Sequence, residues 1–150
     1  MRTGLWSLLG LIGVLVFAAQ DGADKAPAKR FGIAADLKSF PQAEPKETLG
    51  SLLKAVDAKR VDYVLAQLAD PDWVDRRVKE MAGDFRALLE ESTARLVADP
   101  AALKRLKKLL ADGEWKTDAG AAVVRLKDVE DAAMFFRKAD GRWYVENRKK

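Results

Sequence analysis

The spacing of hydrophobic residues predicts two helical segments at the start of the folded part of the chain. Apolar side chains recur every three or four residues along 49–56 and again along 61–68, which is typical of amphipathic helices. Pro45 suits the first turn of the first segment, because the N–H that proline lacks has no helical partner there. The Asp70-Pro71 pair predicts the end of the second segment. We therefore expect two short helices, or one bent helix, over 45–70.

A longer hydrophobic stripe follows and predicts a further helix. Its apolar residues run along 74–96 at helical spacing, and we expect Asp72 to be its N-cap. The Asp99-Pro100 pair ends this helix and begins another, because these residues are favoured at the N-cap and at the first helical position. Gly113 predicts the end of that last helix.

Beyond residue 113 the hydrophobic pattern alternates, which indicates strands. The Asp140-Gly141 pair predicts a tight hairpin, since glycine readily adopts the positive φ that such turns require. The expected strands cover 122–127, 132–138 and 142–147, and 114–117 is expected to add an edge strand. The pattern predicts an α+β fold, with N-terminal helices packed on a C-terminal antiparallel meander of three to four strands.

Residues 1–18 have the pattern of a secretory signal peptide. Arg2 supplies a positive charge, an apolar run follows, and Ala18 and Ala19 fit a cleavage site between them. The apolar run is shorter than the ~20 residues that a membrane-spanning helix needs. We expect an extracytoplasmic protein, secreted or periplasmic. The alternative is a domain that an uncleaved leader anchors to the membrane.

Residues 19–44 differ in composition from the segments on either side. Ala, Asp, Lys, Gly and Pro are frequent here and no hydrophobic period is sustained, as in a linker. Its apolar residues are too many for a simple tether, so we expect an N-terminal arm that docks on a single domain over 45–150. These residues are Phe31, Ile33, Leu37 and Phe40.

The chain contains neither cysteine nor histidine. Without cysteine it can form no disulfide, thiolate metal site or thiol nucleophile. Without histidine it lacks the commonest general base and the commonest metal ligand. Its carboxylate groups do not have the spacing of a calcium-binding loop. We therefore expect no metal and no cofactor.

The net charge of +4 is small and the two signs are interleaved, which does not favour a nucleic-acid partner. One basic cluster lies beside a leucine stripe on the helix expected before Gly113. It consists of Lys104, Arg105, Lys107 and Lys108. The cluster is interpreted as a solvated helix face, or else as a contact surface for an anionic membrane or polymer.

The closing segment 135–147, FFRKADGRWYVEN, resembles the last hairpin of the nuclear-transport-factor-two-like superfamily. In those domains an aromatic strand, an Asp-Gly turn and a Trp-containing strand close a cone-shaped sheet around a pocket. The stretch 49–70 is similar to their opening helices, whereas no strand is predicted over 72–110, where many members have one. The resemblance implies a cone-like fold with a pocket. Its members include isomerases, dehydratases and non-catalytic binding domains, so the fold does not settle function.

Aromatic side chains are the expected lining of such a pocket. The candidates are Tyr63, Trp73, Phe85, Trp115, Phe136 and Trp143, with core packing as the alternative explanation. An enzyme would need Asp70 or Asp72 as a general acid or base and Tyr63 as a hydrogen-bond donor. Both aspartates also fit helix termini, which argues against that role.

The sequence therefore favours an exported, non-catalytic binding or accessory domain with an apolar pocket. Its partner would be a small apolar ligand or another protein. The helix face with Val78, Met81, Phe85 and Leu88 is an alternative contact surface for a homodimer. The other hypotheses are an envelope-associated module that binds proteins or anionic surfaces and, less favoured, a histidine-free isomerase or dehydratase.

Overall fold

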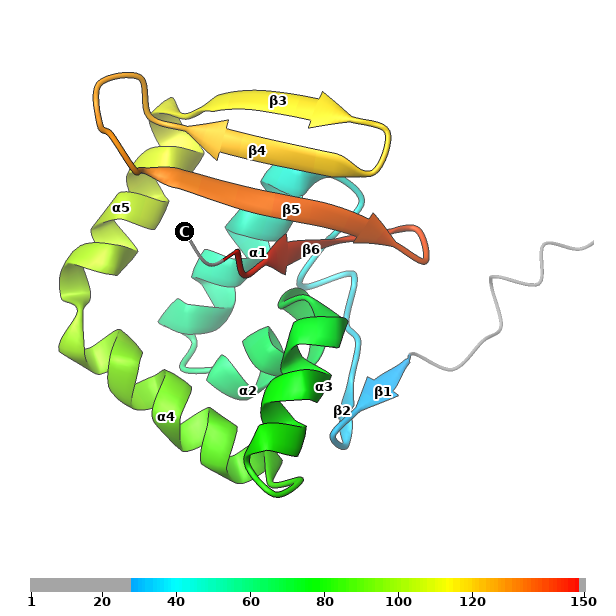
Figure 1. The fold of residues 1–150 in the computed structure, drawn as a ribbon. Helices are drawn as coiled ribbons and strands as arrows, with labels where there is room; N and C mark the ends of the chain where they lie inside the picture. Colours follow the sequence, from blue (N-terminus) through cyan, green and yellow to red (C-terminus); the bar gives the residue numbers. More distant parts are fainter. Residues whose placement is uncertain (1–27, 149–150) are drawn as a thin grey trace, which may run out of the picture.

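The computed structural model describes residues 28–148 and places the helices before the main sheet (Figure 1). This order confirms the predicted α+β class. The helical elements are α1 (Pro45–Asp57), α2 (Val61–Tyr63), the π-helical segment η1 (Val64–Leu68), α3 (Pro71–Glu80), α4 (Phe85–Ala98) and α5 (Pro100–Asp112). The strands of the main sheet are β3 (Glu114–Asp118), β4 (Ala121–Arg125), β5 (Ala133–Ala139) and β6 (Arg142–Glu146).

The main sheet is an antiparallel meander with the strand order β3-β4-β5-β6, as predicted. Asp140 and Gly141 both have positive φ, 49° and 76°, which fits the type I′ turn of a tight hairpin. Ala122 pairs with Phe136, and Phe136 pairs with Val145. Because directly opposed residues point to the same side of a sheet, one apolar row crosses β4, β5 and β6.

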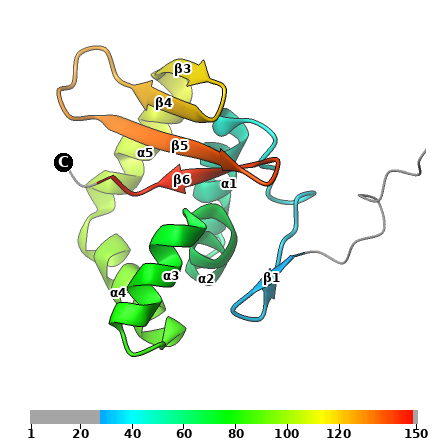
Figure 2. The ribbon, with the colours of Figure 1, turned by 45° about the vertical axis from the view of Figure 1, so that its right-hand side comes forward.

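The face of the sheet that carries Phe136 packs on α1 and α5, and this contact forms the main core. Leu49 of α1 and Phe136 are 0% exposed, and Leu109 of α5 and Trp143 of β6 are also buried. Figure 2 shows both helices behind the strands, whereas α3 and α4 lie at the opposite end of the molecule from β3. Each such buried side chain contributes roughly 1.5–3 kcal/mol.

The free edge of β6 is covered by an earlier segment of the chain. The Trp143 N–H donates to the Gln42 carbonyl at 3.0 Å. The Trp143 carbonyl accepts from the Gln42 amide at 2.8 Å and from the Thr48 hydroxyl at 3.1 Å. These bonds replace the neighbouring strand that an edge lacks, and they join β6 to the start of α1.

The prediction of a single helix over 74–96 is wrong, because the chain turns back between α3 and α4. Ala82 and Gly83 have positive φ, 58° and 80°, which no helix interior allows. Asp84 then caps α4 by accepting from the Arg86 N–H at 2.8 Å. Two packed helices show the same three-and-four spacing as one long helix, so the periodicity does not locate the turn.

The paired helices bury a second, smaller cluster against η1. Its buried members are Leu65, Val74, Val78 and Leu88, and Met81 and Phe85 pack against it partly buried. The helix face considered above as a homodimer surface therefore packs within the chain.

α3 begins earlier than predicted, with Asp70 rather than Asp72 as its N-cap. The Asp70 carboxylate accepts from the Asp72 N–H at 3.2 Å, and Pro71 takes the first helical position. Asp72 lies in the first turn, where a negative charge is favourable. The Asp-Pro pair thus ends one segment and begins the next, as Asp99 and Pro100 do before α5.

Residues 28–44 form an arm whose small hairpin the sequence does not predict. In it β1 (Lys29–Arg30) pairs with β2 (Ile33–Ala34). Gln67 of η1, which is 0% exposed, donates to the carbonyls of Ala28 and Ile33 at 3.0 and 2.8 Å. The buried side-chain amide of Gln67 therefore supplies the hydrogen bonds that a third strand would otherwise give to these two carbonyls.

The apolar residues of the arm differ in their packing. Phe40 is buried in the main core, and Ile33 packs against it. Phe31 stacks on Phe85 of α4 with ring centroids 4.2 Å apart. Leu37 is 48% exposed, so the expectation that it docks is wrong.

Gly113 ends α5 for a reason other than the positive φ expected of a helix C-terminus. Its φ is −68°, which any residue adopts. A Cβ at this position would lie 2.3 Å from the Leu109 carbonyl oxygen and 2.3 Å from Cγ2 of Val124. Only glycine lets the end of α5 approach β4 this closely.

The predicted signal peptide over 1–18 lies outside the described residues. Within 28–148, no helix combines the length and hydropathy needed to cross a membrane.

Candidate functional site

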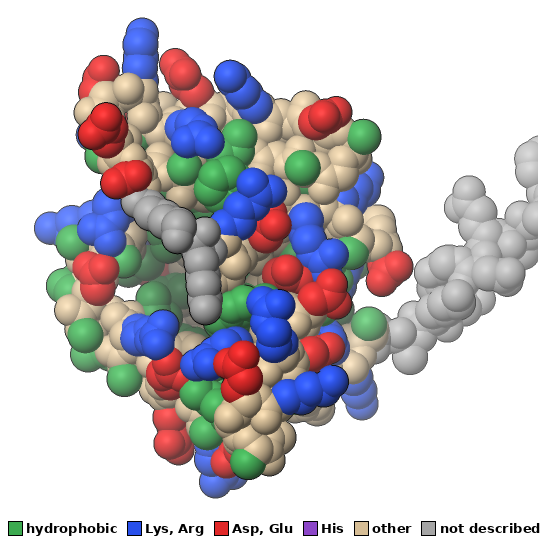
Figure 3. All heavy atoms as spheres, viewed as in Figure 1, with side chains coloured by type: hydrophobic (Ala, Val, Ile, Leu, Met, Phe, Trp, Pro, Cys, Tyr) green, Lys and Arg blue, Asp and Glu red, His purple; other side chains and the backbone are tan. Residues whose placement is uncertain are grey.

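A cavity of about 490 Å³ opens between the helical end of the fold and strands β5 and β6. Most of its wall is apolar, and it is formed by Val64, Leu65, Ala69, Trp73, Ala133, Met134, Phe135 and Val145. Arg125, Asp131, Glu146, Asn147 and Arg148 complete the lining. Figure 3 shows a hollow on this face with hydrophobic side chains inside it and Lys and Arg side chains beside it. The volume lies within the range of about 300–1,000 Å³ that is usual for small-molecule sites.

The helical wall of the cavity is joined to the sheet by backbone bonds. Ala69, where η1 ends, forms a parallel bridge with Val145 of β6. The Asp70 N–H donates to the Val145 carbonyl at 2.8 Å. η1 itself is closed by a bond from the Ala69 N–H to the Val64 carbonyl at 2.8 Å. This π-helical turn, a geometry frequent at functional sites, presents Val64 and Leu65 to the cavity.

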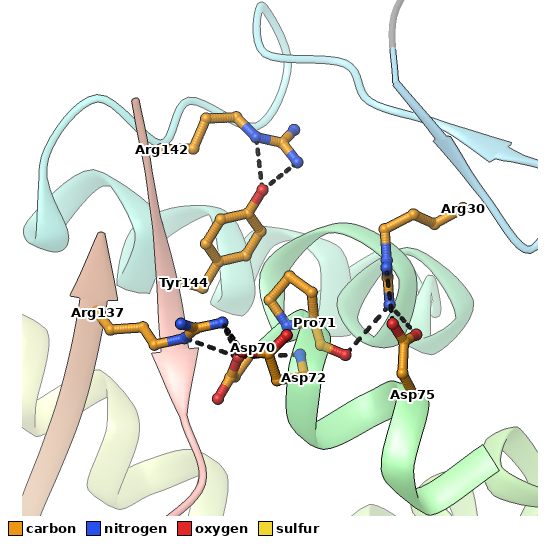
Figure 4. A network of polar contacts seen from close by, with 8 residues as sticks. All are labelled: Arg30, Asp70, Pro71, Asp72, Asp75, Arg137, Arg142 and Tyr144. Carbon is orange, nitrogen blue, oxygen red and sulfur yellow. Dashed lines mark hydrogen bonds and ion pairs between the residues drawn. The ribbon is translucent and has the colours of Figure 1, made fainter. Parts of the chain in front are cut away.

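A network of charged side chains fixes the first turn of α3 (Figure 4). Arg137 of β5 donates to the Asp70 carboxylate at 2.8 Å through Nε and to the Asp72 carboxylate at 2.8 Å through Nη2. Burial disfavours the charged form of Arg137, but the hydrogen bonds and charges of Asp70 and Asp72 outweigh it and raise the pKa of Arg137. Trp73 follows one residue after Asp72, so this network holds the tryptophan at the cavity.

The arm holds the opposite side of the same helix. Arg30 donates to the Asp75 carboxylate at 2.6 Å and to the Pro71 carbonyl at 3.4 Å. It also donates to the Ala66 carbonyl at 3.1 Å. The start of α3 is therefore tied to the sheet by one arginine and to the arm by another.

Two arginines lie over an aromatic ring in the sheet wall. The guanidinium of Arg148 is 4.3 Å from the centroid of the Phe135 ring, and that of Arg125 is 5.6 Å from it. Arg148 also pairs with Glu146 at 3.0 Å. Cations over an aromatic face are attracted to its π-electrons, so Phe135 and the two arginines order this part of the wall.

A second hollow, of about 670 Å³, adjoins the cavity. Its lining is Trp73, Arg76, Arg77, Glu80, Arg95 and Asn147, and Trp73 and Asn147 line the cavity as well. Arg77 donates to Glu91 at 3.0 Å, and Arg95 also pairs with Glu91. The hydrogen bond from Arg77 to Glu80 raises the pKa of Arg77. We call this hollow the arginine groove.

Of the six aromatic residues expected to line a pocket, only Trp73 lies at the cavity. Tyr63, Phe136 and Trp143 are buried in the main core. Trp115 packs against that core beside Phe136, with the two ring centroids 5.4 Å apart. Phe85 packs on the second cluster and against Phe31. Core packing, the alternative explanation, thus describes five of the six.

The Asp and Tyr side chains considered for catalysis do not meet at the cavity. The Tyr63 hydroxyl accepts from the Asp36 N–H at 2.9 Å, and burial raises the pKa of Tyr63. Asp70 is engaged by Arg137 and by the helix N-terminus. A general acid or base needs access to a bound substrate, and neither group lines the cavity.

The basic cluster on α5 is exposed, as a solvated face requires. Arg105 pairs with Asp99 at 3.0 Å and Lys107 with Asp57 at 3.8 Å, whereas Lys104 and Lys108 form no ion pair within the described residues. No group of three or more potential metal ligands is present in the described part of the chain.

Sequence reasoning missed the arginines of the groove and most of the cavity wall. Trp73, Arg76, Arg77 and Glu80 follow the spacing i, i+3, i+4, i+7, so they form one face of α3. Two arginines and a tryptophan on one helix face could therefore have been recognised in the sequence as a candidate binding surface. The wall residues carry no such signal, because each also fits an ordinary core position.

The family of this chain is not identified by its similarity to other proteins. No protein-family model matches it, and neither a curated protein nor a solved structure does.

Proposed function

We propose that the protein is an exported, non-catalytic binding domain whose cavity holds a small apolar ligand or the apolar part of one. The observation that carries the proposal is the cavity of about 490 Å³ with mainly apolar walls. The backbone pairing of Ala69 and Asp70 with Val145 of β6 and the ion pairs at α3 hold these walls in place without a ligand. A preformed apolar cavity binds with little ordering cost.

The charged groups at the cavity support binding rather than catalysis. Its carboxylates are Asp131, which is exposed, and Glu146, which pairs with Arg148 at 3.0 Å. A general acid at neutral pH needs a carboxyl group enclosed in apolar surroundings. The signal-peptide pattern of 1–18 supports export.

Binding is tested with a neutral fluorescent probe, N-phenylnaphthylamine, whose emission rises in apolar surroundings. Ala133, the first residue of β5, lines the cavity, so we expect Ala133→Phe to fill it and to weaken probe binding at least fivefold. Ala121→Phe is the matched control, because Ala121 is the exposed first residue of β4 and lies outside the cavity. Absence of binding, or equal binding by all three proteins, would contradict the proposal.

Export is tested on the protein recovered from the extracytoplasmic fraction of its own cells. Mass spectrometry should give the mass of residues 19–150. Recovery of the full chain from the cytoplasm alone would contradict export while leaving the binding test unaffected.

A further inference from the structure

The cavity and the arginine groove meet at Trp73 and Asn147, which line both. On one side of this boundary the walls are mainly aliphatic and aromatic. On the other side they carry Arg76, Arg77 and Arg95, with Glu80 as the acidic residue of the lining. A molecule that crosses the boundary therefore has an apolar part in the cavity and a polar end in the groove.

The groove carries more positive than negative charge. Arg77 is shared between Glu80 and Glu91, and Arg95 pairs with Glu91. Arg76 forms no ion pair or side-chain hydrogen bond among residues 28–148. Three arginines thus face two glutamates. A guanidinium with unused N–H groups binds a carboxylate or phosphate through two parallel hydrogen bonds.

We infer that the ligand is a single-chain amphiphile with an anionic head, its chain in the cavity and its head at Arg76 and Arg95. This inference rests on the proposed function, since it names the class of apolar ligand that the cavity takes. The acidic groups of the cavity do not oppose it, because the lining carries two arginines, Arg125 and Arg148, as well as Asp131 and Glu146, and Arg148 pairs with Glu146. Carboxylate and phosphate monoester heads share this recognition chemistry.

The test is displacement of N-phenylnaphthylamine by four dodecyl compounds below their micellar concentrations. These are dodecanoate, dodecyl phosphate, dodecanol and dodecyltrimethylammonium. We expect the better of the two anions to displace the probe at a concentration roughly tenfold lower than dodecanol, and the cation to be the weakest. The comparison of dodecanoate with dodecyl phosphate shows which head the groove prefers.

Charge-matched variants then locate the head. Arg76→Gln and Arg95→Gln should each reduce the advantage of the anion over dodecanol while leaving dodecanol unchanged. Arg86→Gln is the control, because it removes the same charge from an exposed position on α4 outside the groove. Equal affinities for dodecanol and both anions, or an equal effect of Arg86→Gln, would overturn the inference. In those cases probe binding persists, whereas its absence would overturn the proposed function itself.

Discussion

The ion pair between Arg137 and Asp70 is expected to stabilise the fold by joining α3 to β5. The side chain of Asp70 is 14% exposed and that of Arg137 is 31% exposed, so their hydrogen bond is only partly screened by water. Hydrogen bonds to charged groups contribute about 1.5–3 kcal/mol when they are sheltered. The second partner, Asp72, is 79% exposed, and such a surface pair adds under about 1 kcal/mol. We expect Arg137→Gln to lower the free energy of unfolding by about 2 kcal/mol.

The assay is urea denaturation of a double-mutant cycle. Asp70→Asn is the second variant, since asparagine caps a helix as well as aspartate does and only the charge is lost. The coupling energy between the two positions should be roughly 1–2 kcal/mol, and the melting temperature of Arg137→Gln should fall by roughly 6–10 °C. A coupling energy near zero would refute the reasoning. Arg86→Gln, at an exposed position on α4, serves as the charge control.

Three further predictions concern Tyr63, Gln67 and Gly113. Burial raises the pKa of Tyr63, so with rising pH the unfolded chain loses its phenolic proton before the folded protein does. The free energy of unfolding should therefore be highest below about pH 10 and should fall as the pH rises towards the pKa of Tyr63 in the folded protein. Urea titrations between about pH 8 and 11 should show a shallower loss in Tyr63→Phe, and an unchanged slope would contradict this. Gln67→Met should lower the free energy of unfolding by about 3 kcal/mol in the same assay, because two carbonyls of the arm lose their hydrogen-bond donor. A loss under about 1 kcal/mol would show that water replaces the amide as the donor. Gly113→Ala should lower the free energy of unfolding by about 2 kcal/mol, because the added Cβ would meet the backbone of Leu109. Gly120→Ala is the control and should lower it far less, because Gly120 faces open space. Similar losses for the two variants in thermal denaturation would count against the close approach of α5 to β4.

Local sequence patterns were enough to predict the sheet. β4 and β6 alternate in sequence, β5 carries an apolar cluster at 134–136, and the Asp140-Gly141 turn sets the pairing of β5 with β6, so local signals agree with the final structure. The helices were predicted less completely. The turn between α3 and α4 depends on Ala82 and Gly83 at positive φ. Alanine gives no signal for that conformation, and the signal of Gly83 followed by Asp84 was missed because the hydrophobic spacing continues across it.

Of the six aromatic residues predicted to line a pocket, Trp73 alone lies at the cavity. Large aromatic side chains suit a pocket and a core equally, and the choice depends on which elements pack around each ring. Phe136 is enclosed because α1 and α5 both cover its side of the sheet. Trp73 reaches the cavity because Arg137 and Asp70 fix the start of α3 at its edge.

The order of helices before strands and the lack of thiol and imidazole groups could be predicted from the sequence, because they follow from local patterns and composition. The filled main core and the separate cavity beside a groove of arginines could not be predicted in this way and are known from the folded structure. That arrangement comes from contacts between distant residues, such as Asp70 with Val145 and Arg30 with Asp75. Hydrophobic spacing specifies which face of an element is buried, but not which other element covers it.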